Sequence, residues 1–157
     1  MDFELINSKL LDAETCLLEM YKQERRAFDS MNVFPKNHDG FLAICATIRG
    51  LFDGRGDGKR DAAIKAWKSG WERNLTPDER ILYKFMQDES DDTQHVQVLN
   101  VQAGNQYPAG TIMGEVPNTK KRYIYNIDGV QRDVTAVCEA YFKLLSRMVA
   151  EAKQANL

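Results

Sequence analysis

The segment from Phe41 to Ile48 is apolar on almost every side of a helix, and its apolar character continues to Phe52. A helix that has no polar face must be surrounded by the rest of the protein, so we expect this segment at the centre of a helical bundle. The residues that follow, Asp53 to Gly58, include three glycines and predict a turn. A chain of 157 residues is long enough to bury such a core without disulfides or a bound metal.

Segments on both sides of this apolar helix have apolar residues at steps of three and four, which is the spacing of an amphipathic helix. One runs from Ser8 to about Met31, and another runs from Asp61 to Asn74. The second carries Trp67 and Trp71 on one stripe, a pattern more typical of a buried edge than of a platform for a ligand. Between the first helix and the apolar one, Asn32–Gly40 contains a proline and predicts a loop.

The sequence Thr76-Pro77-Asp78-Glu79 carries the clearest local signal for the start of a helix. Thr76 is a good N-cap, Pro77 suits the first helical position, and Glu79 can bond back to the amide of the cap. We expect the helix that follows to reach about Gln94.

After His95 the pattern changes to a near alternation of valines with Gln and Asn, interrupted by turn signals. This predicts a small antiparallel sheet that Asp128-Gly129 ends. Asp133 then suits the N-cap of a final helix that extends to Ala152. The sequence therefore predicts a single, mainly α domain over residues 1–157. It is an antiparallel up-and-down bundle of four to five helices, with a small antiparallel β insertion, residues 96–128, before the last helix.

Charge and cysteine content exclude several classes of protein. A formal net charge of −2 argues against a general nucleic-acid coat protein, because phosphate binding needs a concentrated basic surface. The three cysteines include no Cys-x-x-Cys pair and only two histidines accompany them, which argues against a structural zinc site. We expect Cys16, Cys45 and Cys138 to be free thiols buried on helices, and we expect no metal and no cofactor.

The N-terminus and the uncharged stretches indicate a cytoplasmic protein without a membrane partner. Met1–Glu4 is acidic and lacks the apolar run of a secretory signal. The longest uncharged stretch, Val96–Gly114, is rich in Gln, Asn and Gly and could not span a bilayer.

The last predicted helix before the sheet changes character towards its end. The helical face that is apolar as far as Met86 continues with the polar Glu89. Around it, residues Asp88–Asp92 include four carboxylates. Because burying unpaired carboxylates is costly, we expect this half to be solvated, partnered or at the helix end. The helix dipole and the nearby carboxylates would favour the protonated, positively charged form of His95. One alternative is a weak metal site formed by His95 with Asp91 or Asp92.

Five stretches share their pattern with one known family: Asp12–Arg26, Phe41–Leu51, the helix around Trp67, Leu75–His95 and Val137–Tyr141. They resemble HEPN (higher eukaryote and prokaryote nucleotide-binding) domains, and together they cover most of the chain. The resemblance implies a helical bundle, commonly dimeric, in which one helix carries Arg, often Arg-Asn, followed by His after four to six residues. In active members the Arg orients a phosphate and the His assists attack of a ribose 2′-hydroxyl on it, without a metal.

Only the helix that ends at His95 touches this motif, and it lacks the arginine. In the closest alignment Ser90 stands at the Arg position and Asp91 at the Asn position. A hydroxyl among carboxylates repels phosphate, whereas a guanidinium would attract it. The resemblance therefore implies a degenerate HEPN-like domain that does not cleave RNA by the family mechanism.

Two functions from different classes remain open. The first, which we favour, is a non-catalytic, homodimeric interaction module from a bacterial or mobile-element setting. It would bind a nucleotide or a protein partner such as a nucleotidyltransferase-type antitoxin, and Ser90, Asp91, Arg80 and Arg132 are its candidate binding residues. The second is a metal-independent endoribonuclease effector, of toxin or phage-defence type. It would act on RNA with His95 as catalytic residue and with Arg80 or Arg132 supplied across the dimer.

Overall fold

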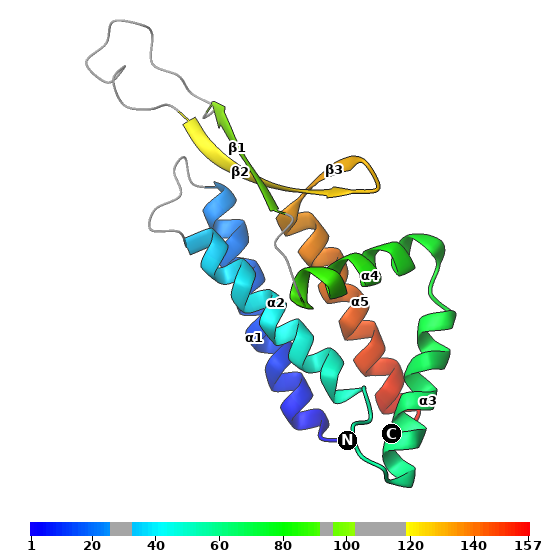
Figure 1. Cartoon of the computed structure of the whole chain (residues 1–157). Coiled ribbons are helices and arrows are strands. Elements are labelled where there is room, and N and C mark those ends of the chain that lie inside the picture. The colour runs from blue at the N-terminus through cyan, green and yellow to red at the C-terminus, as the bar shows by residue number, and fades with distance from the viewer. Residues whose placement is uncertain (26–32, 92–95, 103–118) are drawn as a thin grey trace, which may run out of the picture.

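In the computed structural model the protein is a helical bundle with a small sheet at one end (Figure 1). The structure describes residues 1–25, 33–91, 96–102 and 119–157. Within these residues the order of elements is α1 (Phe3–Arg25), α2 (Val33–Leu51), α3 (Lys59–Arg73), α4 (Pro77–Asp91), β1 (Val96–Gln102), β2 (Thr119–Ile127), β3 (Val130–Asp133) and α5 (Val134–Gln154). The predicted fold class, a mainly α bundle with a small antiparallel sheet before the last helix, is confirmed.

One hydrophobic cluster draws side chains from all five of these helices and from β2. α1 packs against both α2 and α5, and α4 contacts α2 and α5. Trp71 is buried and packs edge-on against Tyr83, while Trp67 lies against Phe52. The prediction that the two tryptophans belong to the packed edge of the bundle is therefore confirmed.

α2 begins at Val33, so the loop predicted over Asn32–Gly40 is wrong for its described part. Pro35 lies in the first turn, where the missing amide hydrogen costs no helical hydrogen bond. Gly40 is helical too, and it allows α1 to come close: a Cβ at this position would lie 3.4 Å from Sγ of Cys16. Pro35 and Gly40, two residue types that usually indicate a loop, thus both lie inside a helix.

α2 is less enclosed than its apolar sequence predicts. It packs against α1, α4 and α5, yet Ala43, Thr47 and Leu51 on one side are exposed. The small size of Ala43 and Thr47 keeps the exposed apolar area low. No helix in the described part of the chain combines the length and the apolar character needed to cross a membrane.

The sheet has the strand order β1-β2-β3, with both pairs antiparallel. On β2, Tyr123, Tyr125 and Ile127 alternate towards the bundle and are buried. The predicted end of the sheet at Asp128-Gly129 is wrong, because these residues form the turn that leads into β3. Their φ angles of 51° and 76° are those favoured by a two-residue hairpin turn. The rest of the predicted sheet, residues 103–118, lies outside the described residues.

Besides α2, two helices begin before the predicted residue, and α3 does so at Lys59, two residues before Asp61. α1 begins at Phe3 rather than Ser8, because Asp2 caps it through a bond from the Leu5 amide (3.0 Å); its predicted end at Met31 lies outside the described residues. Asp133 does occupy the N-cap position of α5 as predicted, but its side chain does not bond the helix amides. It accepts a hydrogen bond from Nε of Arg122 instead (2.8 Å).

The start of α4 is confirmed in full. The amide of Glu79 donates to the Thr76 hydroxyl (3.2 Å), and the amide of Thr76 donates to the Glu79 carboxylate (3.0 Å). The same carboxylate accepts two further bonds from the guanidinium of Arg147 on α5 (2.6 and 3.0 Å). Arg147 in turn lies over the ring of Trp71. Glu79 thus links the start of α4 to α5 and, through Arg147, to α3.

Replacing Glu79 by alanine removes both the cap bond and the Arg147 pair. We expect Glu79→Ala to lower the free energy of unfolding by about 1.5 kcal/mol, of which the cap accounts for about 1 kcal/mol and the partly exposed ion pair for the rest. Urea unfolding at neutral pH measures the change. Glu14→Ala, at an exposed helical glutamate that makes no ion pair with the described residues, is the matched control and should stay within about 0.5 kcal/mol of wild type. Equal losses in both variants would contradict the assignment.

Candidate functional site

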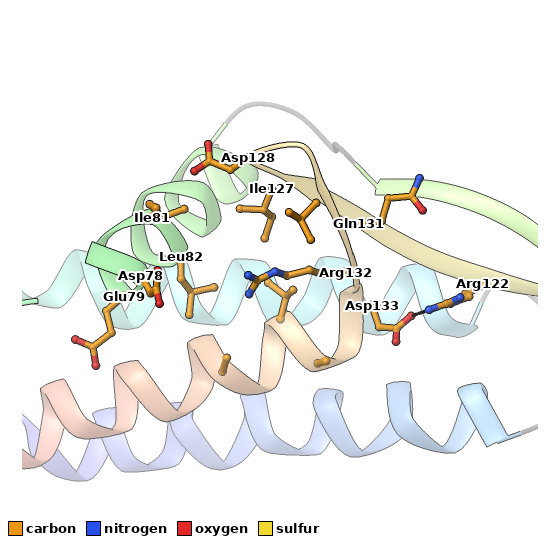
Figure 2. A pocket seen from close by; sticks show the side chains of 14 residues that line it. Asp78, Glu79, Ile81, Leu82, Arg122, Ile127, Asp128, Gln131, Arg132 and Asp133 are labelled. Carbon is orange, nitrogen blue, oxygen red and sulfur yellow. Dashed lines mark hydrogen bonds and ion pairs between the residues drawn. The ribbon is translucent and has the colours of Figure 1, made fainter. Parts of the chain in front are cut away.

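A groove of about 560 Å³ lies between the first turns of α4, the β2–β3 hairpin and α5 (Figure 2). Its apolar walls come from elements that are far apart in the sequence. Ile81 and Leu82 line the α4 side, while Ile127 and Val130 line the hairpin side. Ile81 and Val130 remain 41% and 53% exposed. The groove therefore offers accessible apolar surface on two facing walls.

Charged groups of both signs surround these walls, and several of them are already paired. Arg122 is paired with Asp133, and Glu79 is paired with Arg147 outside the groove lining. Asp78, Asp128 and Arg132 make no ion pair with any of the described residues. Figure 2 shows the Arg132 side chain extending from the hairpin towards α4, with Asp78 beyond it. Arg132 is thus the cation of the groove that remains available to a ligand.

Both walls of the groove are held firmly by the fold. The α4 wall is fixed by the Thr76–Glu79 capping bonds and by the pair of Glu79 with Arg147. The hairpin wall is fixed by Tyr125, whose ring packs against Phe85 with a centroid distance of 5.0 Å. Because the walls do not depend on a ligand for their position, little ordering is required on binding.

The predicted site residues are not brought together in one place. Arg132 lines the groove, but Arg80 donates to the carbonyls of Arg73 (3.2 Å) and Leu75 (3.4 Å) at the end of α3. Ser90 lies ten residues farther along α4, which is about 15 Å of helix, and its hydroxyl donates to the carbonyl of Met86 (2.6 Å).

Two further predicted site residues, Asp91 and His95, have side chains outside the described residues. Asp91 is the last residue of α4, and its side chain lies outside the described set, as does the whole of His95. The predicted role of His95 with Arg80 or Arg132 and the alternative metal site of His95 with Asp91 or Asp92 therefore depend on residues outside the described set. Among the described residues no group of three or more His, Cys, Asp or Glu side chains could hold a metal ion.

A buried polar cluster lies deeper in the bundle, and sequence analysis missed it. His38 on α2 is only 3% exposed, and its Nε2 shares a hydrogen bond with the Tyr125 hydroxyl. The expected loop over residues 32–40 hid this role. The spacing of Phe34, His38, Phe41 and Cys45 on one helical face was the signal that could have revealed it. Enclosed in this way, the imidazole is out of reach of a substrate.

Glu89 belongs to the same interior region, although it is a carboxylate. This half of α4 was expected to be solvated, partnered or at the helix end. Glu89 is only 4% exposed, so it is not solvated. Burial above all raises the pKa of the Tyr125 hydroxyl, and the nearby Cys138 thiol and Glu89 carboxylate add to the increase. Glu89 thus lies near the neutral Tyr125 hydroxyl and the neutral Cys138 thiol in the interior.

The cysteines behave as structural residues. Cys45 and Cys138 are buried and Cys16 is half-buried, and all three are free thiols. Burial raises the pKa of both Cys45 and Cys138 well above the ordinary value. Since only the thiolate is a good nucleophile, neither thiol is suited to covalent catalysis at neutral pH.

Comparison with models of known protein families, with curated proteins and with solved structures finds no match to this chain. The HEPN-like assignment therefore stays a prediction that rests on the sequence resemblance.

The buried imidazole makes stability depend on pH in a defined window. Burial lowers the pKa of His38 from 6.5 to about 4, against a smaller opposing effect of the Asp39 carboxylate. Between these values the unfolded chain binds more protons than the folded protein, so acidification favours unfolding. We expect the free energy of unfolding to fall, by at most about 1.4 kcal/mol per pH unit, as the pH drops from 6.5 towards 4.

Urea unfolding at several pH values between 7 and 5 measures this slope, above the range in which carboxylates such as Glu79 titrate. His38→Gln should flatten it, whereas His95→Gln, which leaves His38 in place, should preserve it. An NMR titration of the wild-type protein gives an independent reading. A His38 ring that titrates near pH 6.5 would show that burial does not hold it neutral.

Proposed function

We propose that this protein is a non-catalytic, HEPN-like interaction module that binds a segment of another protein in the groove between α4 and the β2–β3 hairpin. The observation that carries the proposal is the combination of two facing apolar walls with the guanidinium of Arg132, which makes no ion pair with the described residues. An apolar cleft with a few convergent polar groups is the usual form of a binding site. The apolar walls supply affinity, and Arg132 selects a segment with a carboxylate near its apolar side chain.

The charge of the groove favours a protein segment over a nucleotide or RNA. Asp78, Glu79, Asp128 and Asp133 outnumber Arg122 and Arg132 in its lining. Polyphosphate binding needs an excess of cations, because each phosphate has to be neutralised. A peptide can satisfy both signs at once, with one residue of each charge beside an apolar anchor.

The contacts of three residues on α4, the helix that we compare with the HEPN motif, support a role without catalysis. Ser90 stands where the family has its arginine, and its hydroxyl is bound to the backbone of its own helix. The adjacent Glu89 is buried, so a carboxylate occupies the interior beside this position. Arg80, a candidate for the missing cation, is engaged by carbonyls at the end of α3. Among the described residues of α4, no guanidinium is therefore available to bind a phosphate beside Ser90.

Selection of random short peptides displayed on phage against the immobilised protein tests the binding function. We expect enriched peptides to combine an apolar residue with one acidic residue, which pairs with Arg132, and one basic residue, which pairs with Asp78 or Asp128. Val130→Asp and Arg132→Glu should each weaken binding about tenfold, which corresponds to about 1.4 kcal/mol. The matched controls are Val98→Asp, at a valine 50% exposed on β1, and Lys84→Glu, at an exposed cation of α4 outside the groove. Enriched peptides that bind all four variants equally would place the site elsewhere.

Incubation with labelled single-stranded RNA in the presence of EDTA tests the competing activity. We expect no cleavage above a buffer control. Cleavage that disappears in His95→Ala would overturn the proposal in favour of a metal-independent ribonuclease.

A further inference from the structure

One edge of the sheet borders the groove between α4 and the β2–β3 hairpin. Within the described residues the strand order β1-β2-β3 places β3 at this edge, where it pairs with β2 alone. All of its residues, Val130–Asp133, line the groove. An edge strand presents backbone amide and carbonyl groups that the sheet itself does not pair. A ligand in the groove therefore lies beside backbone groups that can form hydrogen bonds.

The hairpin turn decides which of these groups point away from the sheet. The turn at Asp128-Gly129 has two residues, so the flanking pair, Ile127 and Val130, is joined by two hydrogen bonds. Bonded and non-bonded pairs alternate along an antiparallel ladder, so the next residue, Gln131, does not bond β2. Its N–H and C=O point outward, and no backbone hydrogen bond joins it to another described residue.

The groove runs along this edge and not over one face of the hairpin. Val130 pairs with the buried Ile127 and therefore lies on the face that turns towards the bundle. Arg132, two residues farther on, shares that face, whereas Gln131 lies on the opposite one. Figure 2 shows the side chains of Gln131 and Arg132 extending in opposite directions. Because residues of both faces line the groove, it follows the edge between them.

The α5 side of the groove leaves room beside the edge. The exposed residues that line it there are Ala136 and Ala140, which have small side chains. α5 begins directly after Asp133, so β3 offers an edge of four residues. The groove volume of about 560 Å³ is typical of sites that hold small ligands. The edge can therefore pair with a short extended segment.

We infer that the protein segment proposed for this groove binds in an extended conformation, as an antiparallel fourth strand on the free edge of β3. This inference rests on the proposed binding function. The central residue of the segment stands opposite Gln131. Its carbonyl accepts a hydrogen bond from the Gln131 N–H, and its own N–H donates to the Gln131 carbonyl. Antiparallel pairing places both bonds between the same two residues, which suits so short an edge.

Charges along the groove set the order of residues in the segment. In antiparallel pairing the residue before the central one stands opposite Arg132, and the residue after it stands opposite Val130 on the same face. Two positions later the segment passes Asp128 at the turn. Opposite charges are favourable at both ends of this stretch. The expected order is therefore acidic, any, apolar, any, basic, and a parallel strand would need the reverse order.

Two synthetic peptides of equal composition test the direction. The probe is Thr-Asp-Thr-Ile-Thr-Lys-Thr with both ends blocked, and the control is the same sequence reversed. Threonine is chosen for the other positions because it favours strands. NMR titration to about 1 mM peptide measures the dissociation constants, and we expect the probe to bind at least about fivefold more tightly. A control that binds as tightly as the probe would overturn the antiparallel order.

Removing the outward N–H of β3 tests the edge pairing. Gln131→Pro deletes this donor and keeps the bonds to β2, because proline is tolerated at an edge where the N–H faces outward. We expect it to raise the dissociation constant of the probe at least about fivefold. Gln131→Thr, which keeps the N–H, is the matched control and should change the constant less than about twofold. Circular dichroism confirms that both variants remain folded.

N-methylation of the probe gives a second test that does not depend on the folding of a variant. A methyl group on the nitrogen of the threonine before Ile removes the donor to the Gln131 carbonyl and should weaken binding at least about fivefold. A methyl group on the nitrogen of Ile, which points away from β3, is the control. Binding that either Gln131→Pro or the first methyl group leaves intact would overturn the edge pairing but not the proposed function. Wild-type protein that binds neither these peptides nor any displayed peptide would overturn both.

Discussion

The burial of one tyrosine joins the sheet to the bundle, and the site depends on it. Tyr125 on β2 is fully buried, shares a hydrogen bond with His38 on α2 and packs against Phe85 on α4. Beside it Tyr123 stacks on Phe34 with a centroid distance of 4.0 Å. These contacts set the position of β2, and through the short turn at Asp128-Gly129 they set the position of β3 and of Arg132. Without them the hairpin would have no fixed place opposite α4.

The groove is then a consequence of two independent attachments. The sheet is held by aromatic burial and by a neutral hydrogen bond, whereas the start of α4 is held by the carboxylate of Glu79. The two attachments respond to pH in different ranges. His38 has its pKa lowered to about 4 by burial, and Glu79 has its pKa lowered to about 2, chiefly by Arg147. The sheet side is therefore the first to lose stability on acidification.

A fold does not by itself determine function, because one fold can carry unrelated sites in different proteins. If the proposed HEPN-like assignment holds, α4 is the helix on which an active enzyme would carry its phosphate-binding arginine. On α4 the Ser90 hydroxyl is bound to the backbone of its own helix, and Glu89 is buried. Within the described residues, exposed apolar side chains and the guanidinium of Arg132, which makes no ion pair there, gather instead at the groove. The proposed binding of a protein segment follows from this groove.

The sequence by itself determined the centre of each helix, because a helix start such as Thr76–Glu79 and an apolar spacing of three and four are local properties. It also indicated free thiols at Cys45 and Cys138, since both lie on apolar faces. Only the tertiary structure decided that the predicted loop around His38 is helical, that Asp128-Gly129 leads into a further strand, and that Arg80 and Arg132 serve different purposes. The physical reason is that each of these depends on burial or on a partner far along the chain. A proline, a glycine or an arginine has the same local preferences in either setting, and the surrounding protein selects between them.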